Sequence, residues 1–330
     1  MKAAVLKTPS PISGHPLVIE DIPQPEIHPG YVLLRVRACG ICRTDLHIVE
    51  GELHSQKLPL IPGHQIVGEI VRDDTAALPV GTRVGVSWIG GVDGTCPYCR
   101  SGKENLCDSI TFTGYSVDGG YAEFALARAD FVFPLPEELD DLQAAPLLCA
   151  GIIGFRSIKV AGVNRGERVG LFGFGASAHL ILAVLKSWSC DVYVSTRGES
   201  HRELARTLGA KWVGSEYEKP PVALDRAITF APSGDVVIAA LSNLRKGGVV
   251  AINAIHLDRI PEFDYDQLLW GERQIRSVAN MTRDDAREFL RIAAEIQLTP
   301  KVTVFSLNQV NEALAALKRD SIDGAAVLKL

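Results

Sequence analysis

The sequence predicts an α/β protein with a β-rich region first and a parallel, doubly wound sheet after it. Up to about residue 127, short apolar segments with strand-like alternation are separated by Pro and Gly. From Arg168 onward, strand-like segments alternate with segments of helical periodicity. Such alternation is typical of the βαβ units of a parallel sheet. The two textures meet near Pro146, so we expect two domains.

Composition limits the class of protein. The chain has 330 residues, of which 47% are hydrophobic and 22% charged, as in ordinary globular proteins. A net charge of -5 gives no basic face, so we expect no nucleic acid partner. The start lacks the apolar core of a signal peptide, and the longest apolar run, 144–155, is too short to span a bilayer. We therefore expect a cytoplasmic protein without membrane contact, whose seven cysteines are metal ligands or free thiols rather than disulfides.

The first region reads as strands separated by turns. The strand-like segments are 17–23, 31–40, 64–71, 80–89 and 119–127. The segment 90–109 differs from them, because it is rich in Gly, Pro and Cys and shows no periodicity. Its shape must therefore depend on something other than regular secondary structure.

The second region alternates strands with helices and ends in a further helix–strand pair. The expected strands are 168–175, 190–196, 224–230, 247–255, 302–307 and 325–330. The expected helices are 176–188, 201–210, 284–297 and 308–320, and 236–244 continues the rhythm between two strands.

A glycine pattern at the start of the parallel sheet predicts a dinucleotide site. Gly173, Gly175 and Ala178 form G-x-G-x-x-A between a strand and a helix, where backbone can approach a pyrophosphate at the helix N-terminus. The end of the next strand carries Thr196 and Arg197 in place of the acid that NAD-specific domains use for the ribose 2′-hydroxyl. We expect NAD(P) as cofactor, leaning toward NADP(H) with NAD(H) possible. The alternative is that Arg197 only lies along the adenine face of NAD.

Three residues far apart in the sequence could form the first shell of a metal: Cys42, His64 and Cys149. Two thiolates and one imidazole suit tetrahedral zinc with the fourth position open, as in catalytic sites. Spacing proves nothing here, since the fold must bring the three together. Taken singly, Cys149 could be a small buried hydrophobe and His64 a loop histidine bonded to backbone.

Several motifs, in order along the chain, carry a resemblance. They are CGICRTDLH, PGHQIVGE, the cysteine-rich segment, PLLCAG and GFGASA. In this combination the whole chain resembles the zinc-containing medium-chain alcohol dehydrogenases of the bacterial type. The resemblance implies a GroES-like catalytic domain with a Rossmann domain inserted into it. We expect the first domain at 1–150, the Rossmann domain at 151–284 and a return to the catalytic domain at 285–330.

The resemblance also implies roles for individual residues. Cys42, His64 and Cys149 would bind the catalytic zinc, and Asp45 would orient the ligand imidazole. Thr44 and His47 match the family's proton relay. The remaining matches are Arg43 as a second pyrophosphate contact, Trp88 as a wall of the substrate pocket, and Gln65 where the family usually has Glu beside the ligand histidine.

The cysteine-rich segment matches the family's structural zinc lobe with one departure. The family carries four cysteines there, whereas this chain has Asp93 followed by Cys96, Cys99 and Cys107. A carboxylate oxygen is an acceptable zinc ligand, so we expect a second zinc ion at about 90–109. The alternative is that the metal was lost with the first cysteine, leaving three free thiols.

The function that the resemblance implies is a zinc-dependent alcohol dehydrogenase or aldehyde reductase. Zinc would polarise the alcohol oxygen, a proton would leave through Thr44 and His47, and a hydride would pass to or from C4 of the nicotinamide. We expect a small alcohol or aldehyde as substrate and a homo-oligomer, dimer or tetramer. Two alternatives remain: a polyol or formaldehyde-type dehydrogenase, and a catalytically inactive nucleotide-binding structural protein of the same fold.

Overall fold

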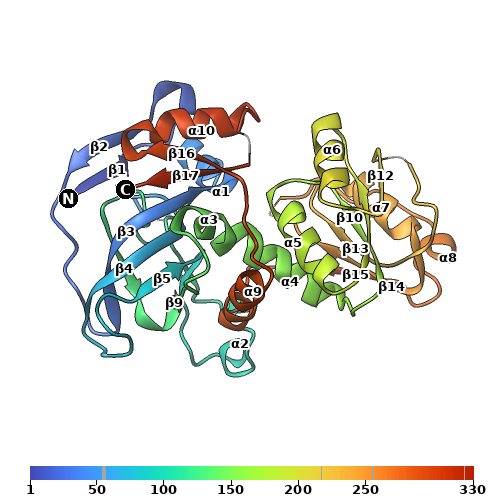
Figure 1. The fold of residues 1–330 in the computed structure, drawn as a ribbon, viewed down its shortest axis with the longest axis horizontal. Coiled ribbons are helices and arrows are strands. Elements are labelled where there is room, and N and C mark those ends of the chain that lie inside the picture. Colours follow the sequence, from blue (N-terminus) through green and yellow to red (C-terminus); the bar gives the residue numbers. More distant parts are fainter. Residues whose placement is uncertain (54–56, 217, 255, 323) are drawn as a thin grey trace. The chain divides into compact units, whose positions relative to one another are not determined.

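The computed structural model describes residues 1–53, 57–216, 218–254, 256–322 and 324–330. The chain forms two units (Figure 1). The first unit comprises Met1–Cys149 and Thr282–Leu330, and the second comprises Ala150–Met281. Both chain termini therefore belong to the first unit.

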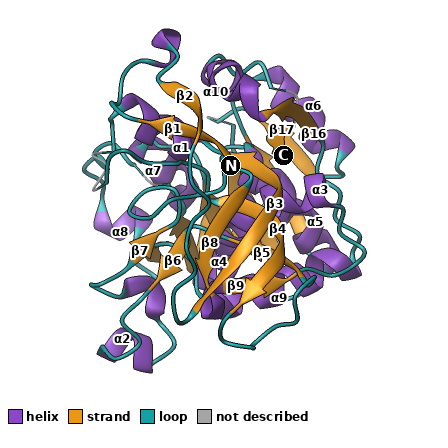
Figure 2. Ribbon diagram, turned by 90° about the vertical axis from the view of Figure 1, so that its left-hand side faces the viewer, coloured by secondary structure: helices purple, strands orange, loops and turns teal. Residues whose placement is uncertain are grey.

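The first unit is built on a sheet of seven strands in the described part of the chain, in the order β16-β17-β3-β4-β5-β9 with β8 beside β3 (Figure 2). Their bounds are β3 (Tyr31–Ile41), β4 (Gln65–Asp73), β5 (Arg83–Val86), β8 (Phe124–Arg128), β9 (Val132–Pro134), β16 (Val302–Ser306) and β17 (Ala325–Lys329). Two further pairs are β1 (Lys2–Leu6) with β2 (Leu17–Asp21), and β6 (Ile89–Gly91) with β7 (Thr111–Phe112). The α-helices are α1 (Arg43–Glu50), α2 (Pro97–Arg100), α3 (Asp141–Pro146), α9 (Arg283–Glu295) and α10 (Val310–Lys318).

The register of β3 and β4 matters most for the site. The two strands are antiparallel, and Gly40 lies opposite Gln65. The chain leaves β3 after Ile41 and enters β4 at Gln65, so Cys42 and His64 lie at the same end of this pair. Strand pairing thus brings together two residues that are 22 positions apart in the sequence.

The second unit contains, in its described residues, a parallel sheet of six strands in the order β12-β11-β10-β13-β14-β15. Its strands are β10 (Arg168–Phe172), β11 (Asp191–Ser195), β12 (Trp212–Gly214), β13 (Leu224–Thr229), β14 (Leu244–Ile252) and β15 (Gln274–Ser277). Its α-helices are α4 (Ile152–Ala161), α5 (Ala176–Ser187), α6 (Glu199–Thr207), α7 (Gly234–Ser242) and α8 (Tyr265–Leu268). Strand order reverses direction at β10, and right-handed crossovers therefore place α5 and α6 on one face and α7 on the other. This is the predicted doubly wound arrangement.

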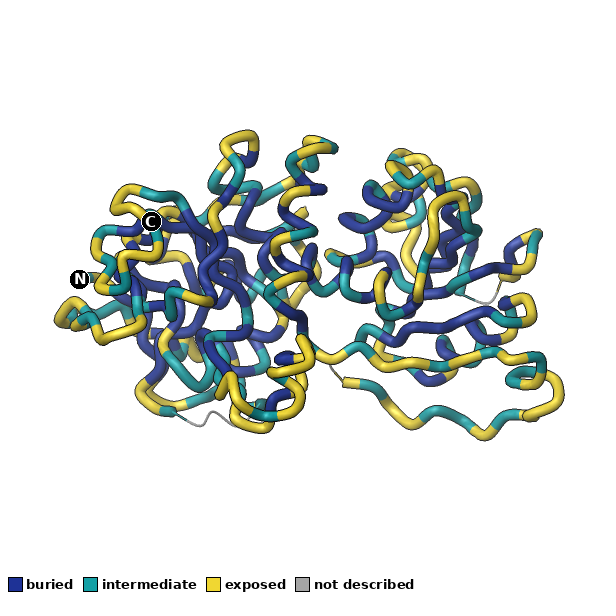
Figure 3. Tube along the Cα trace, turned by 90° about the horizontal axis from the view of Figure 1, so that it is seen from below, coloured by how far each residue is buried: buried dark blue, intermediate teal, exposed yellow. Residues whose placement is uncertain are grey.

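Each unit has its own apolar core, and Figure 3 shows buried chain inside each unit with exposed chain at its rim. Several elements that the sequence did not indicate are short, such as α1, β7, β9 and β12, whereas the apolar helix α4 is a longer one. The predicted strand 247–255 corresponds to β14, which ends at Ile252, while Ile255 lies outside the described residues.

The apolar run at 144–155 lies within a helical stretch that is longer than the run itself. The helical stretch Asp141–Ala161 has 21 residues, so the expectation that it is too short to span a bilayer is wrong on length. Length and composition alone are weak evidence of a membrane span. Since 67% of its most apolar window is buried inside the fold, we interpret this stretch as a core helix.

Candidate metal and cofactor sites

Cys42, His64 and Cys149 converge in the first unit. Their ligand atoms all lie within 4.8 Å of one another. Cys42 is the N-cap of α1, His64 immediately precedes β4, and Cys149 lies in the π-helical turn Leu147–Gly151. A π-helical turn is wider than an α-helical one and is frequent at functional sites. The fold therefore gathers two thiols and one imidazole, the set that suits zinc with an open position.

A buried carboxylate orients the imidazole of His64. Nδ1 of His64 lies 2.9 Å from Oδ1 of Asp45, and Oδ2 of the same carboxylate accepts a hydrogen bond of 2.8 Å from the Cys42 backbone N–H. Among the described residues, the other ring nitrogen, Nε2, is buried without a hydrogen-bond partner. A buried polar atom of this kind is costly unless a ligand satisfies it. The donor set and this unpaired nitrogen both fit a bound metal ion.

The electrostatics of the cluster also favour a cation. The neighbouring Cys149 and His64 hold the pKa of Cys42 well below its usual range, although burial opposes this. Burial alone would lower the pKa of His64, but the charge and hydrogen bond of Asp45, together with Cys42, raise it to about 10. The Cys42 thiolate raises the pKa of Cys149, and burial adds to that effect. A cation placed among these groups would displace the protons of His64 and Cys149 and stabilise both thiolates.

Aromatic side chains line one side of His64. The ring of Trp88 meets the His64 ring edge to face at 5.0 Å between centroids. Trp88 stacks on Phe112 at 4.7 Å and lies 5.9 Å from Tyr115. Sequence reasoning found Trp88 but missed Phe112 and Tyr115, which follow the cysteine-rich segment. The sequence signal that could have indicated them is the presence of two aromatic residues, three positions apart, in a stretch without clear periodicity.

Thr44 and His47 lie on α1, in different surroundings. Thr44 is buried, and its Oγ1 lies 3.7 Å from the Cys42 sulfur. His47 is partly exposed, and its Nδ1 contacts the carboxylate of Glu52. Glu52 was missed by sequence reasoning. It is brought there by the turn at Gly51, after which the Glu52 backbone N–H bonds to the His47 carbonyl at 2.9 Å.

Two further predicted residues have contacts that the sequence did not indicate. The guanidinium of Arg43 forms an exposed ion pair with Asp320, which follows α10. Gln65 is buried, and a Cβ atom at Gly40 would lie only 2.9 Å from its amide carbon. Gly40 therefore makes room for the Gln65 side chain across the strand pair.

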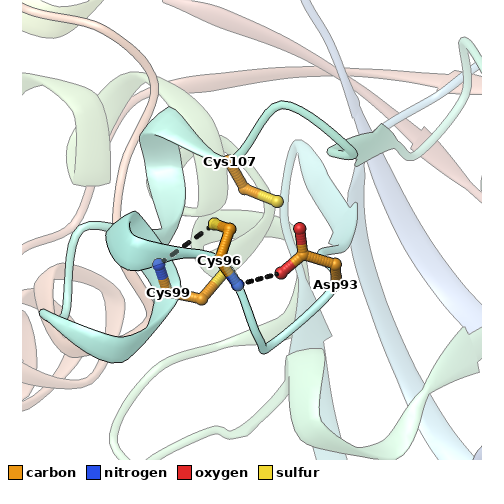
Figure 4. Close-up of side chains that lie close together, drawn as sticks. All are labelled: Asp93, Cys96, Cys99 and Cys107. Atoms are coloured by element: carbon orange, nitrogen blue, oxygen red, sulfur yellow. Dashed lines mark hydrogen bonds between the residues drawn. The ribbon is translucent and has the colours of Figure 1, made fainter.

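Asp93, Cys96, Cys99 and Cys107 form a second cluster, with side chains that point toward one another (Figure 4). Their ligand atoms also lie within 4.8 Å of one another. Oδ1 of Asp93 accepts hydrogen bonds from the backbone N–H groups of Thr95 and Cys96, at 2.7 and 2.9 Å. These bonds, that of Cys96 first, hold the pKa of Asp93 well below its usual range. One anionic oxygen thus faces three thiols, an arrangement that fits a closed metal site.

The glycine pattern lies at the carboxyl end of β10. Gly173 has φ +86°, and a Cβ atom there would meet the Ala231 backbone nitrogen at 3.0 Å. A Cβ atom at Gly175 would meet nothing within 4 Å. Gly175 is the N-cap of α5 and provides no side-chain cap for its first N–H groups, while Ala178 is buried on the helix. The loop therefore combines helix N–H groups that the Gly175 N-cap does not cap with open space at Gly175, as an anion-binding helix N-terminus requires.

At the carboxyl end of β11, Thr196 and Arg197 differ in exposure. Thr196 is buried and its backbone N–H donates to the Gly214 carbonyl at 3.1 Å. The Arg197 side chain is 79% exposed, and its Nε lies 3.2 Å from Oε2 of Glu216. Sequence reasoning missed Glu216, because nothing near Arg197 in the sequence indicates this partner.

The β-rich unit and the doubly wound sheet define the class of protein, a medium-chain dehydrogenase fold. Residues 28–137 match the family described as the alcohol dehydrogenase GroES-like domain. The chain is 44% identical over 337 residues to the probable alcohol dehydrogenase AdhA of Mycobacterium tuberculosis, covering 99% of this chain and 97% of that protein. It is 36% identical to an alcohol dehydrogenase of Geobacillus stearothermophilus, with 100% of each chain covered.

Among solved structures, acetophenone reductase from Geotrichum candidum in complex with NAD is similar, with a TM-score of 0.86 and 26% identity. The match covers 100% of this chain and 97% of that one. The chain belongs to the zinc-containing medium-chain alcohol dehydrogenase family and is an oxidoreductase that acts on alcohols. The predicted fold, family and enzyme class are confirmed.

Proposed function

We propose that this enzyme is an NAD(P)-dependent alcohol dehydrogenase or aldehyde reductase whose catalytic zinc is held by Cys42, His64 and Cys149. The observation that carries the proposal is the convergence of these three ligand atoms within 4.8 Å, with a buried His64 nitrogen that has no partner among the described residues. The first unit is then the catalytic domain, and the second is the dinucleotide-binding domain.

The protein's own groups hold and orient the reacting centre. Zinc at such a site supplies polarisation of an alcohol or carbonyl oxygen, and the nicotinamide cofactor supplies the redox chemistry. Asp45 fixes which His64 nitrogen faces the metal, because it takes the hydrogen bond of Nδ1. Trp88, Phe112 and Tyr115 form an apolar wall that suits a small alcohol or aldehyde.

Proton transfer is assigned to Thr44 and His47. The buried Thr44 hydroxyl lies beside the Cys42 sulfur, where it can accept the proton of a substrate hydroxyl. His47 is partly exposed and can pass a proton to water. Glu52 holds the imidazole by its Nδ1, which leaves Nε2 to exchange the proton.

Cofactor binding is assigned to Gly173, Gly175 and Ala178 for the pyrophosphate, with Arg43 as a second contact. Thr196 gives the adenosine ribose no carboxylate, and Arg197 offers a cation that can bind a 2′-phosphate. We expect use of both cofactors with a modest lean toward NADPH. Thr196→Asp should swing the preference to NADH, and Arg197→Ala should weaken NADPH binding more than NADH binding.

A second zinc ion is assigned to Asp93, Cys96, Cys99 and Cys107. Four ligands leave no open position, so this ion would be structural. A homo-oligomer and a cytoplasmic location stay predictions.

The test joins metal counting to a rate assay. We expect about two zinc ions per chain, and a change in absorbance at 340 nm with an alcohol panel and either cofactor. A polyol or formaldehyde-type dehydrogenase would show its preference in the same panel. Binding of cofactor without turnover of any alcohol or aldehyde would favour the inactive nucleotide-binding alternative and contradict the proposal.

A further inference from the structure

We propose that Glu216 sets the cofactor choice of this enzyme by opposing the 2′-phosphate that Arg197 would otherwise bind. The inference rests on the proposed function, since it concerns the part of the cofactor site that meets the adenosine ribose. It assigns to an acidic residue after β12 a role that dinucleotide-binding domains usually give to a residue after β11.

Strand register brings the two side chains together. In the parallel pair β11–β12, Ser195 lies opposite Gly214. Two residues further along each strand direction, the chain reaches Arg197 and Glu216. Parallel strands end at the same edge of a sheet, so both residues leave the sheet where the ribose of a dinucleotide binds. The ion pair of 3.2 Å between them follows from this register.

The carboxylate is the less exposed partner of this pair. The Glu216 side chain is 18% exposed, whereas that of Arg197 is 79% exposed. Next to Glu216 in the sequence, the Ser215 backbone N–H donates a hydrogen bond of 2.6 Å to Oε2 of Glu218. The ion pair thus places the exposed guanidinium of Arg197 beside a carboxylate that is mostly shielded from solvent.

The two charges act oppositely on the two cofactors. A guanidinium carries five N–H donors and the Arg197 side chain is 79% exposed, so donors remain available to a 2′-phosphate beside the Glu216 contact. A dianionic phosphate placed there would also approach the Glu216 carboxylate, and like charges at this range repel strongly in a partly buried site. A ribose 2′-hydroxyl meets no such repulsion and can donate to a carboxylate. Glu216 thus offsets the attraction of Arg197 and keeps the preference for NADPH small.

The test is the binding of each reduced cofactor to the zinc-loaded enzyme, followed by nicotinamide fluorescence without substrate. Glu216→Gln keeps an oxygen acceptor for Arg197 and removes the charge. We expect it to tighten NADPH binding by about tenfold, the effect of removing one near charge, with NADH binding changed less than about twofold. Glu216→Ala should change the ratio of the two dissociation constants in the same direction.

Asp191→Asn is the matched control. Asp191 forms a 2.6 Å ion pair with Lys211 between the same two strands, at their amino ends. Asp191→Asn changes the net charge of the protein by the same amount as Glu216→Gln, but at the opposite end of the strands from the ribose site. We therefore expect it to leave the ratio of the NADPH and NADH dissociation constants unchanged. An unchanged ratio in both Glu216 variants, equal tightening of both cofactors, or the same shift in Asp191→Asn would overturn the inference. A wild type that binds neither cofactor would overturn the proposed function as well, which separates the two failures.

Discussion

The two cysteine clusters of the first unit contain similar ligands but are held in different ways. The first cluster takes its ligands from the end of β3 (Cys42), the start of β4 (His64) and a helical turn (Cys149). The carboxylate of Asp45 orients the imidazole of His64 through a hydrogen bond. The second cluster lies in a segment of short turns, where the described hydrogen bonds among its members are local. Examples are the bonds from Cys96 N–H to Asp93 and from Cys99 N–H to the Cys96 sulfur, at 2.9 and 3.4 Å.

The comparison shows that packing alone can position the ligands of the first cluster, whereas the ligands of the second cluster need a metal ion to position them. Strand pairing and the apolar core already bring the first cluster together, so its shape does not depend on a metal ion. The turns around Cys96 and Cys99 bury little apolar surface, and cross-linking by a metal would supply their order. We therefore expect loss of the first metal to remove activity, and loss of the second to remove stability.

The largest expected effect is on turnover. Cys42→Ser or Cys149→Ala should lower kcat/KM on the order of a thousandfold or more, since metal polarisation supplies several kcal/mol of transition-state stabilisation. The melting temperature should change little, because the surrounding strands remain paired. Cys190→Ser, at a cysteine that belongs to neither cluster, is the control and should stay active. Full activity after either cluster substitution would contradict the catalytic assignment.

The next effect is on metal content and stability. Asp93→Ala should reduce zinc from about two ions per chain to about one and lower the melting temperature, while the turnover of the surviving protein stays nearly constant. Metal analysis and thermal unfolding measure both. Asp108→Ala removes a neighbouring exposed acid outside the cluster and should leave both unchanged. An unchanged metal count in Asp93→Ala would show that this carboxylate is not a ligand.

A smaller effect concerns pH. Burial and the neighbouring Cys96 raise the pKa of Cys99 to about 12, so this thiol holds its proton near neutral pH and metal binding must displace it. The apparent metal affinity should therefore rise with pH. Asp93 adds no proton to this release, because its pKa is lowered and it is already ionised.

Replacing that aspartate sharpens the same measurement. Asp93→Cys should bind zinc more tightly, because thiolate is the softer donor. It should also make the plot of log affinity against pH steeper by about one proton between pH 6 and 8. Chelator competition at several pH values measures both quantities. Equal slopes in the two proteins would show that residue 93 does not bind the metal as an ionised ligand.

The smallest expected effect lies beside the first cluster. Gln65→Glu adds a negative charge near the metal position and disfavours an anionic form of the substrate oxygen. The pH–rate profile for alcohol oxidation should move upward, by up to about one unit. Gln65→Met keeps the size without the charge and should leave the profile in place. A downward movement, or none, in Gln65→Glu would contradict this account of the residue.

The sequence by itself determined the class of fold and the family. Alternation of strand and helix after Arg168 and the glycine pattern at 173–178 are local features that can be interpreted without knowledge of the rest of the chain. The family followed from the order of the cysteine, histidine and glycine motifs, which is also read directly from the sequence. Helix α1 was not predicted because it is short and polar. Its N-terminal capping box is made by Cys42 and Asp45, without the usual Ser or Thr at the N-cap.

Only the tertiary structure decided which residues meet. Glu216 reaches Arg197 through the register of two parallel strands, and His64 reaches Cys42 through an antiparallel pair. Asp320 reaches Arg43 across 277 residues of sequence. Such partners cannot be found from periodicity or composition, because the contacts depend on strand register and on packing between distant segments, which no local stretch of sequence encodes.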